Sequence, residues 1–158
     1  MADLTVTITE SVTLNGAARG STNTLTVSGV DDIYHRIVTV PASVDTTLAN
    51  FHATTGVADS SLDVENVKYI RVTNLDGSNP VNLSLQIDAG EDDSAADAST
   101  TILLEAGKSF MMGSPSDGIA TDDDAATIIT TLNNLESIIA DSVSAAVQVE
   151  VFIASVVA

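Results

Sequence analysis

Apolar and polar residues alternate along most of this chain with a period of two. The alternation is clearest in residues 4–9, 81–87 and 147–151, whose sequences are LTVTIT, VNLSLQI and VQVEV. This period places every other side chain on the same face of an extended strand. The pattern therefore predicts a chain built from β-strands.

The first expected strand is long and interrupted. Its apolar residues keep one parity over residues 4–14, and the interruption at Glu10 predicts a bend or bulge. Asn15-Gly16 then supplies a turn. A second strand is expected over residues 24–27, and it should stop at Ser28-Gly29.

A third strand is expected just before the least regular part of the chain. It covers residues 33–40 and ends where Pro41 removes a backbone donor. Residues 41–66 mix Thr, Ser, Asp and Gly with isolated apolar residues. They predict a long loop that carries one short strand near residues 48–52.

Two β-hairpins are expected in the middle of the chain. The first pairs residues 67–73 with residues 81–87, because the connection 74–80 concentrates residues that tolerate tight or left-handed backbone. The second pairs residues 101–105 with residues 109–112 around a short turn that contains glycine.

The region after Asp122-Asp123-Asp124 fits either a helix or a strand. Helical spacing of its apolar residues, with acidic residues ahead of them, suits the positive end of a helix dipole over residues 124–140. β-Branched threonines and the turn-prone pair Asn133-Asn134 favour a strand. We favour the strand, so that residues 135–143 pair with residues 147–156 as a last hairpin. The apolar residues concerned are Ile128, Ile129, Leu132, Leu135 and Ile139.

Strands separated by turns at this frequency, with no convincing helix between them, predict an all-β fold. We expect an antiparallel β-sandwich, jelly-roll-like, with about eight to ten short strands and at most one short helix. No Gly/Pro/Ser-rich linker divides the 158 residues, so residues 1–158 are expected to form a single β-sandwich domain.

Composition determines the kind of core and suggests a shared surface. Aromatic residues make up 3% of the chain and tryptophan is absent, so the core must be aliphatic. The mean hydropathy is +0.28 although 17% of the residues are charged. This combination predicts that some apolar surface is shared with partner subunits.

Charge excludes two classes of partner. The formal net charge is −17, from 22 acidic residues against five lysines and arginines. Nucleic acid and anionic membrane surfaces both require clustered basic side chains, and the five here are dispersed. We therefore expect no nucleic-acid partner and no membrane partner.

The sequence predicts no targeting signal or membrane span, and it contains no cysteine. The first residues lack the basic start and apolar run of an export signal, and no stretch approaches the roughly 18 apolar residues of a membrane span. We expect synthesis and assembly in a cytoplasm. Zero cysteine removes disulfides, thiol catalysis and cysteine-based zinc sites.

Residue types that could carry catalysis are sparse. Neither His35 nor His52 has a second histidine or carboxylate at ligand spacing, so they are interpreted as ordinary strand histidines. No Gly-x-Ser-x-Gly elbow occurs, and Ala106-Gly107-Lys108-Ser109 has only the ending of a phosphate-binding loop. We predict no catalytic, cofactor-binding or metal-ligating residue, and no enzyme.

Two acidic loops leave calcium binding open. Asp88, Glu91-Asp92-Asp93 and Asp97 lie in one loop, and Asp117 with Asp122-Asp123-Asp124 lies in the other. Both offer hard oxygen ligands, but neither has the spacing of an EF-hand loop. Solvated loops that discourage edge-to-edge aggregation are the favoured interpretation.

The C-terminal run, residues 147–158, begins with clean alternation and ends apolar on both faces. A strand covered from two sides has this pattern. A central strand of the sandwich is the favoured interpretation, and a contact between subunits is the alternative.

Three segments carry a resemblance to a known class of proteins. They are residues 67–85 (VKYIRVTNLD running into NPVNLSL), residues 103–110 (LLEAGKSF) and residues 149–154 (VEVFIA). Each looks like a segment that recurs in small virion proteins of marine tailed bacteriophages. The resemblance implies a β-sandwich virion component that is repeated many times on a particle, acts by contact alone and has no catalytic residues.

The expected function is that of a bacteriophage virion structural protein, and its expected location is the virion, assembled in the host cytoplasm. The leading interpretation is a capsid decoration or accessory protein that forms homo-oligomers and contacts the major capsid protein. The alternatives are a neck or tail component, a tail-tip module that binds a receptor or glycan, and a hydrolase. The sequence leaves open the oligomer number and the position on the particle.

Overall fold

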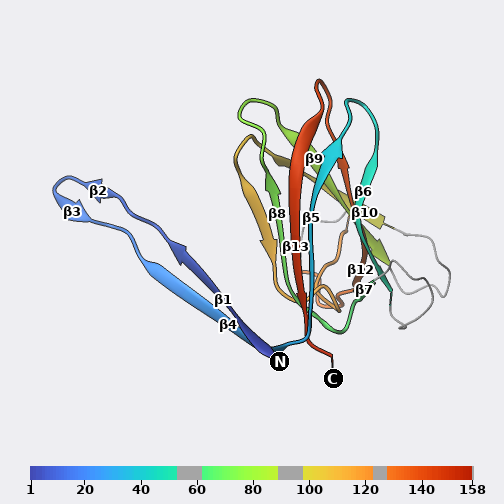
Figure 1. The fold of residues 1–158 in the computed structure, drawn as a ribbon, viewed down its shortest axis with the longest axis horizontal. Coiled ribbons are helices and arrows are strands. Elements are labelled where there is room, and N and C mark those ends of the chain that lie inside the picture. Colours follow the sequence, from blue (N-terminus) through green and yellow to red (C-terminus); the bar gives the residue numbers. More distant parts are fainter. Residues whose placement is uncertain (53–61, 89–97, 123–127, 158) are drawn as a thin grey trace.

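The computed structural model describes residues 1–52, 62–88, 98–122 and 128–157. Within these ranges all regular secondary structure is β, and no helix occurs. The molecule consists of a two-layered β-sandwich and a long β-hairpin that projects away from it (Figure 1). The strands are β1 (Ala2–Thr9), β2 (Thr13–Leu14), β3 (Ala17–Ala18), β4 (Thr22–Val30), β5 (Asp32–Val40), β6 (Thr46–His52), β7 (Leu62–Asp63), β8 (Val67–Asn74), β9 (Val81–Asp88), β10 (Ala98–Leu104), β11 (Ser109–Met112), β12 (Asn134–Asp141) and β13 (Val147–Ser155).

The sandwich has the strand arrangement of a jelly roll. One sheet has the order β11-β8-β13-β5, and the other has the order β10-β9-β12-β6-β7. All pairs in both sheets are antiparallel except the short contact of β6 with β7. Most strands that follow one another along the chain, such as β5 and β6 or β12 and β13, lie in opposite sheets, whereas β9 and β10 form a hairpin in one sheet, as in the double-sheet jelly roll. The predicted all-β, jelly-roll-like sandwich is therefore confirmed.

Alternation along each strand produces the core. In β9 the side chains of Val81, Leu83, Leu85 and Ile87 are buried, and the polar side chains between them are partly exposed. The same parity buries alternate residues of β13 in the facing sheet. These aliphatic side chains form one continuous cluster between the sheets, with Phe51 as its only fully buried aromatic residue among those described. The expectation of an aliphatic core is confirmed.

All three predicted hairpins of the sandwich are wrong, although their strands are present. β8 and β9 lie in opposite sheets, as do β10 and β11, and β12 and β13. Each pair is an arch that crosses the core, and not a hairpin within one sheet. Val72 of β8 lies opposite Phe110 of β11, and Leu83 of β9 lies opposite Ile102 of β10.

The physical reason is that an arch and a hairpin use the same turn residues. Stacked sheets lie about 10 Å apart and an extended chain advances about 3.3 Å per residue, so a short connection spans the gap. An arch also places the apolar faces of two consecutive strands against each other. Val72 near the end of β8 and Val81 at the start of β9 both belong to the common core.

The buried residue Asn74 ties two of the arches together. Its backbone N–H donates to the carbonyl oxygen of Lys108 at 3.0 Å, and its carbonyl accepts from the N–H of Gly107 at 3.1 Å. Its carboxamide donates to the carbonyl oxygens of Asn79 and Leu104 at 2.8 and 3.2 Å. The 74–80 and 106–108 connections are therefore held side by side at one end of the sandwich.

The C-terminal part of the ambiguous region 124–140 is a strand, as favoured from the sequence. β12 covers Asn134–Asp141 and lies between β9 and β6. Residues 128–133 have no regular structure apart from one bridge between Ile119 and Asn133, and residues 123–127 lie outside the described ranges. Among the described residues, none belongs to a helix of the length and apolar character needed to cross a bilayer.

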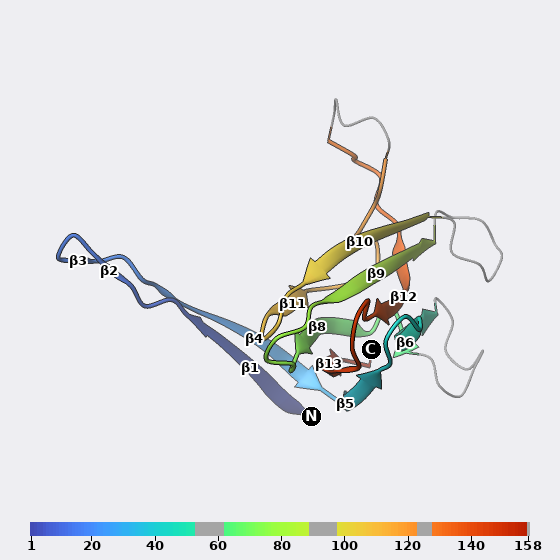
Figure 2. The ribbon, with the colours of Figure 1, turned by 90° about the horizontal axis from the view of Figure 1, so that it is seen from above.

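The projecting hairpin, residues 1–30, is formed by β1 and β4 and is extended by β2 and β3 toward its tip (Figure 2). We call it the arm. β1 ends at Thr9, where a bend or bulge within one strand was expected, and the tip turn has Asn15 and Gly16 at φ values of 51° and 77°. Two consecutive positive φ values are those of a type I′ turn, which matches the twist of the strands. The predicted end at Ser28-Gly29 is wrong, because β4 continues to Val30.

Candidate functional site

The arm has two chemically different faces. Residues directly opposite one another on antiparallel strands point to the same side of the ribbon. The pairs Leu4 with Val27 and Val6 with Leu25 therefore form one aliphatic face, which Ile8 continues. The opposite face consists of three threonine pairs: Thr5 with Thr26, Thr7 with Thr24, and Thr9 with Thr22.

The aliphatic face is covered only at the root of the arm. There Leu4, Val6 and Val27 pack against a small cluster that includes Tyr69 and Ala154 on the outer face of the β8-β13 sheet. This contact explains why the C-terminal strand is apolar on both sides. β13 is the predicted central strand, since it lies between β8 and β5, and its second apolar side faces the chain's own arm.

Farther out, the aliphatic face leaves the sandwich and forms one wall of an open groove. Val6, Ile8 and Leu25 line it from the arm together with the polar residues Asn23 and Thr24, while Tyr69, Met111, Met112 and Gly113 line it from the sheet. The volume of this groove is about 320 Å³. We call it the root groove.

The tip of the arm carries further uncovered aliphatic side chains. Val12 is 53% exposed and Leu14 is 59% exposed. A two-stranded ribbon is at best marginally stable in water without a third layer on its apolar face. The outer arm is therefore the part of the described surface with the clearest need for a partner.

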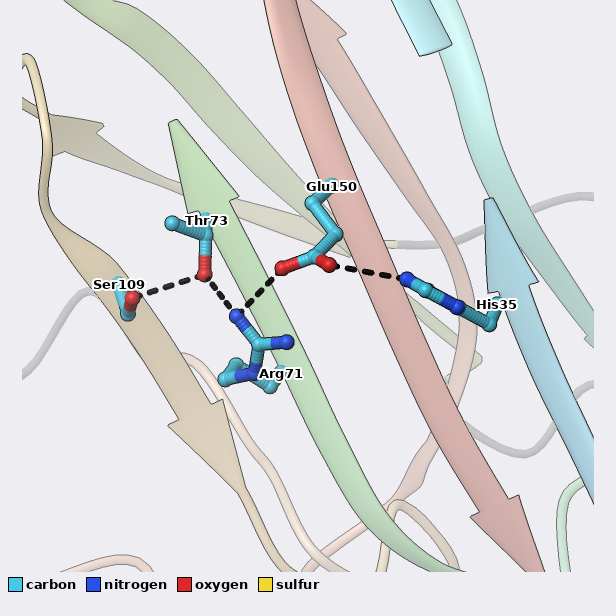
Figure 3. A network of polar contacts seen from close by, with 5 residues as sticks. All are labelled: His35, Arg71, Thr73, Ser109 and Glu150. Atoms are coloured by element: carbon cyan, nitrogen blue, oxygen red, sulfur yellow. Dashed lines mark hydrogen bonds and ion pairs between the residues drawn. The ribbon is translucent and has the colours of Figure 1, made fainter. Parts of the chain in front are cut away.

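Beside the arm root, the outer face of the four-stranded sheet holds a polar network (Figure 3). Glu150 on β13 accepts from Nε2 of His35 at 2.9 Å and pairs with Nη1 of Arg71 at 2.7 Å. Arg71 also donates to Oγ1 of Thr73 at 2.6 Å, and that oxygen lies 2.8 Å from Oγ of Ser109. Four strands, β5, β13, β8 and β11, are thereby linked across the sheet.

This network lowers the pKa of Glu150. The hydrogen bond from His35 is the main cause and the hydrogen bond from Arg71 is the second, while partial burial opposes both. The negative form of Glu150 is thus favoured in the folded protein. The ring of Phe152 lies 5.6 Å from the ring of His35 and 6.0 Å from Cζ of Arg71, so it supports both partners of the carboxylate.

Within the polar network of Figure 3, the geometry does not place a nucleophile beside a base. A hydrolytic triad needs a hydroxyl in direct reach of the histidine. Figure 3 shows Ser109 and His35 at opposite ends of the network, with Arg71 and Glu150 between them. His52, the other histidine, lies at the end of β6 opposite Asp63 of β7. The structure does not bring the two histidines together in one network.

The acidic residues proposed for calcium are only partly within the described ranges. Residues 91–93, 97, 123 and 124 lie outside them. Among the residues that the structure does describe, no group of three or more histidine and acidic side chains could hold a metal ion. Asp117 has its backbone N–H bonded to Oδ1 of Asn134 at 2.9 Å, an arrangement that fixes a loop.

A second groove lies on the five-stranded sheet and is polar. It has a volume of about 270 Å³ and is lined by Asp45, Asn82, Ser84, Gln86, Thr101, Ile139 and Asp141. None of these side chains is aromatic, so the groove lacks the stacking platform that a sugar ring usually occupies.

Sequence reasoning missed two surface features, the polar network around Glu150 and the threonine face of the arm. The Glu150–His35 pair joins residues 115 positions apart, and no local spacing signals it. The threonine face of the arm did leave a signal, because the alternation in residues 4–9 and 24–27 places threonine at every second position. That regularity distinguishes a ribbon with one polar face from a strand buried on both sides.

Comparisons with protein-family models, with curated proteins and with solved structures find no match to this chain. The fold and its surfaces define the molecule as a jelly-roll β-sandwich with a projecting, two-faced β-arm.

Proposed function

We propose that this chain is a structural protein of a bacteriophage virion, and that it acts as a capsid decoration or accessory protein through protein contacts alone. The observation that carries the proposal is the arm, whose aliphatic face is uncovered beyond its root and whose tip exposes Val12 and Leu14. A catalytic domain has no need of such an arm, whereas an assembling subunit does.

Two further lines support the proposal. Jelly rolls are used by viral capsid domains, although lectins and cupins share them, so the fold alone does not determine the function. The resemblance of residues 67–85, 103–110 and 149–154 to segments of small phage virion proteins favours the viral interpretation. The net charge of −17 keeps the free subunit soluble and argues against nucleic acid as the partner.

In this proposal the partners are further copies of the chain and the major capsid protein. Repetition on a particle raises the effective concentration of each contact, so individually weak interfaces are sufficient. The protein is assembled in the host cytoplasm and resides in the virion.

Mass spectrometry of gradient-purified particles that contain this gene product tests the proposal. We expect its peptides to copurify with the major capsid protein in a fixed ratio that corresponds to many copies per particle. Gold-labelled antibody should decorate heads, whereas labelling of the neck or tail would assign it there. Recovery only in the soluble fraction of the lysate would contradict a virion role.

A glycan-binding tail-tip module is the second candidate, and the polar groove on the five-stranded sheet is the observation that favours it. Titration with oligosaccharides, monitored by NMR, should then shift resonances of Asn82, Ser84 and Gln86. Shifts at these residues that an Asn82→Ala variant abolishes would favour this function over decoration.

A further inference from the structure

The arm leaves two apolar surfaces uncovered at its two ends. The root groove lies where the arm meets the sheet, between Leu25 and Met111. The tip surface is formed by Val12 and Leu14. The arm projects away from the sandwich in both views, so the tip of one chain cannot reach the root groove of the same chain (Figures 1 and 2).

The distribution of charge along the chain indicates which surface the arm can approach. Residues 1–30 contain two of the 22 acidic side chains and one of the five basic ones, which are Asp3, Glu10 and Arg19. The rest of the chain carries the remaining acidic charge. The arm is therefore the part of this acidic protein that approaches another copy with the least repulsion, and Arg19 near its tip is attracted to the acidic body of that copy.

The root groove matches an aliphatic occupant. Its described lining contains no charged side chain, and aliphatic, thioether and tyrosine groups predominate in it over the two polar residues Asn23 and Thr24. Gly113 leaves space, because a Cβ at this position would have no neighbour within 4 Å. Methionine side chains adapt to irregular partners, and Met111 and Met112 form much of one wall.

We propose that the tip of the arm of a second copy, with Val12 and Leu14, occupies the root groove. The inference rests on the proposed function, because it specifies how one copy contacts the next. The contact joins two different surfaces of the same chain, so it is heterologous and repeats head to tail. Such contacts close into a ring when the rotation between subunits permits it.

The same contact gives the arm its missing third layer. The tip of the incoming arm lies against Ile8 and Leu25, which are exposed in the single chain. The threonine face of each arm remains in water, where its hydroxyls need no protein partner.

Disulfide cross-linking tests the contact directly, because the chain has no cysteine of its own. Leu14→Cys and Met111→Cys are prepared as separate variants of the full chain, mixed and oxidised. We expect a cross-linked dimer in the mixture. A matched mixture of Thr7→Cys with Met111→Cys, which uses the threonine face, should give no cross-link. If Leu14→Cys links only to itself, the head-to-tail arrangement is overturned.

Light scattering after gel filtration tests which face of the arm the association between copies requires. We expect the unmodified chain to form oligomers, and Leu14→Asp or Leu25→Asp to weaken the association about tenfold or more. Thr7→Asp and Thr26→Asp place the same charge on the threonine face, at residues that do not line the root groove, and should leave the association unchanged. A monomeric unmodified chain, or equal effects on both faces, would overturn the inference.

A variant that fills the groove separates docking from folding. Gly113→Phe should abolish association while the circular dichroism spectrum stays that of the folded chain. Gly77→Phe is the matched control, because Gly77 also has no neighbour within 4 Å of an added Cβ. Association that persists in Gly113→Phe contradicts the groove as the docking site.

The outcomes for this inference and for the proposed function are distinguishable. A monomeric chain that is still found in purified virions would overturn the arm contact and leave the virion role intact. An oligomer that is absent from virions would overturn the virion role and leave the arm contact intact.

Discussion

Glu150 and His35 lie on neighbouring strands in diagonal positions, and Oε1 of the carboxylate accepts from Nε2 of the imidazole at 2.9 Å. Arg71 reaches the second oxygen of the same carboxylate from the strand on the other side. Glu150 is thus held between two donors on the outer face of the sheet, beside the root of the arm. A carboxylate in this position makes the stability of the sandwich sensitive to acid.

The first prediction concerns pH. The pKa of Glu150 is lowered in the folded protein, so its ordinary value of 4.5 belongs to the unfolded chain. Its contribution to stability is therefore fully present above pH 4.5 and is lost as the pH falls through the lower, folded pKa. We expect Glu150→Gln to lower the free energy of unfolding by about 1 kcal/mol or less at neutral pH, because the pair is partly exposed.

Urea unfolding of Glu150→Gln and of the unmodified chain, at neutral and at acid pH, checks this. The difference between the two proteins should shrink as the pH falls below 4.5. Glu105→Gln, at an exposed position outside the network, serves as the control and should cause no pH-dependent difference. A difference for Glu150→Gln that grows in acid would contradict the assignment.

The second prediction concerns Asn74. Asn74→Ala leaves the carbonyl oxygens of Asn79 and Leu104 and the backbone N–H of Asp76 without their side-chain partner. Each buried polar group without a partner costs about 1–3 kcal/mol. We expect a loss of about 2–4 kcal/mol in the free energy of unfolding, measured by urea titration. Asn50→Ala changes an exposed strand residue and should stay within about 0.5 kcal/mol.

The sequence predicted strands and buried faces well, and it failed on which strands are neighbours. Alternation in residues 81–87 identified Leu83 and Leu85 as inward-facing, and both are buried. The same alternation contains no information on which strand lies alongside. The choice of neighbouring strands follows from burying the apolar faces of the two sheets against each other. Val72 and Val81 belong to one core because their strands lie in opposite sheets.

The candidate surfaces were predictable only in part. The apolar character of residues 147–156 correctly indicated a strand covered on both sides. Its second cover is the root of the arm, which lies more than a hundred residues away in the sequence and was expected to be part of the sandwich itself. Contacts between distant segments, such as the packing of Val27 against the cluster of Tyr69 and Ala154, depend on the whole topology, which local patterns do not specify.

The third prediction compares two glycines in turns. Gly107 has φ of +71°, whereas Gly77 has no positive φ, and a Cβ at either position would meet no neighbour within 4 Å. Space is therefore equal and only the backbone conformation differs. Gly107→Ala should lower the free energy of unfolding by about 1 kcal/mol. Gly77→Ala should be neutral or slightly stabilising, because it restricts the unfolded chain.

Thermal unfolding of both glycine variants, followed by circular dichroism, is sufficient to compare them. The midpoint of Gly107→Ala should fall below that of the unmodified chain, and the midpoint of Gly77→Ala should not. Equal decreases would contradict the left-handed conformation of Gly107 as the cause of its loss of stability.

The last prediction tests which side chains of the paired strands β9 and β10 face the core. Leu83 on β9 is fully buried, whereas Leu103 on β10 is 60% exposed and lies opposite Asn82. Leu83→Ala removes the same atoms as Leu103→Ala, but only the first leaves a cavity between the sheets. We expect Leu83→Ala to cost about 2–5 kcal/mol and Leu103→Ala to stay within about 0.5 kcal/mol. Similar losses for the two variants, measured by urea unfolding, would mean that β10 presents its other face to the core and that the register of β9 with β10 is wrong.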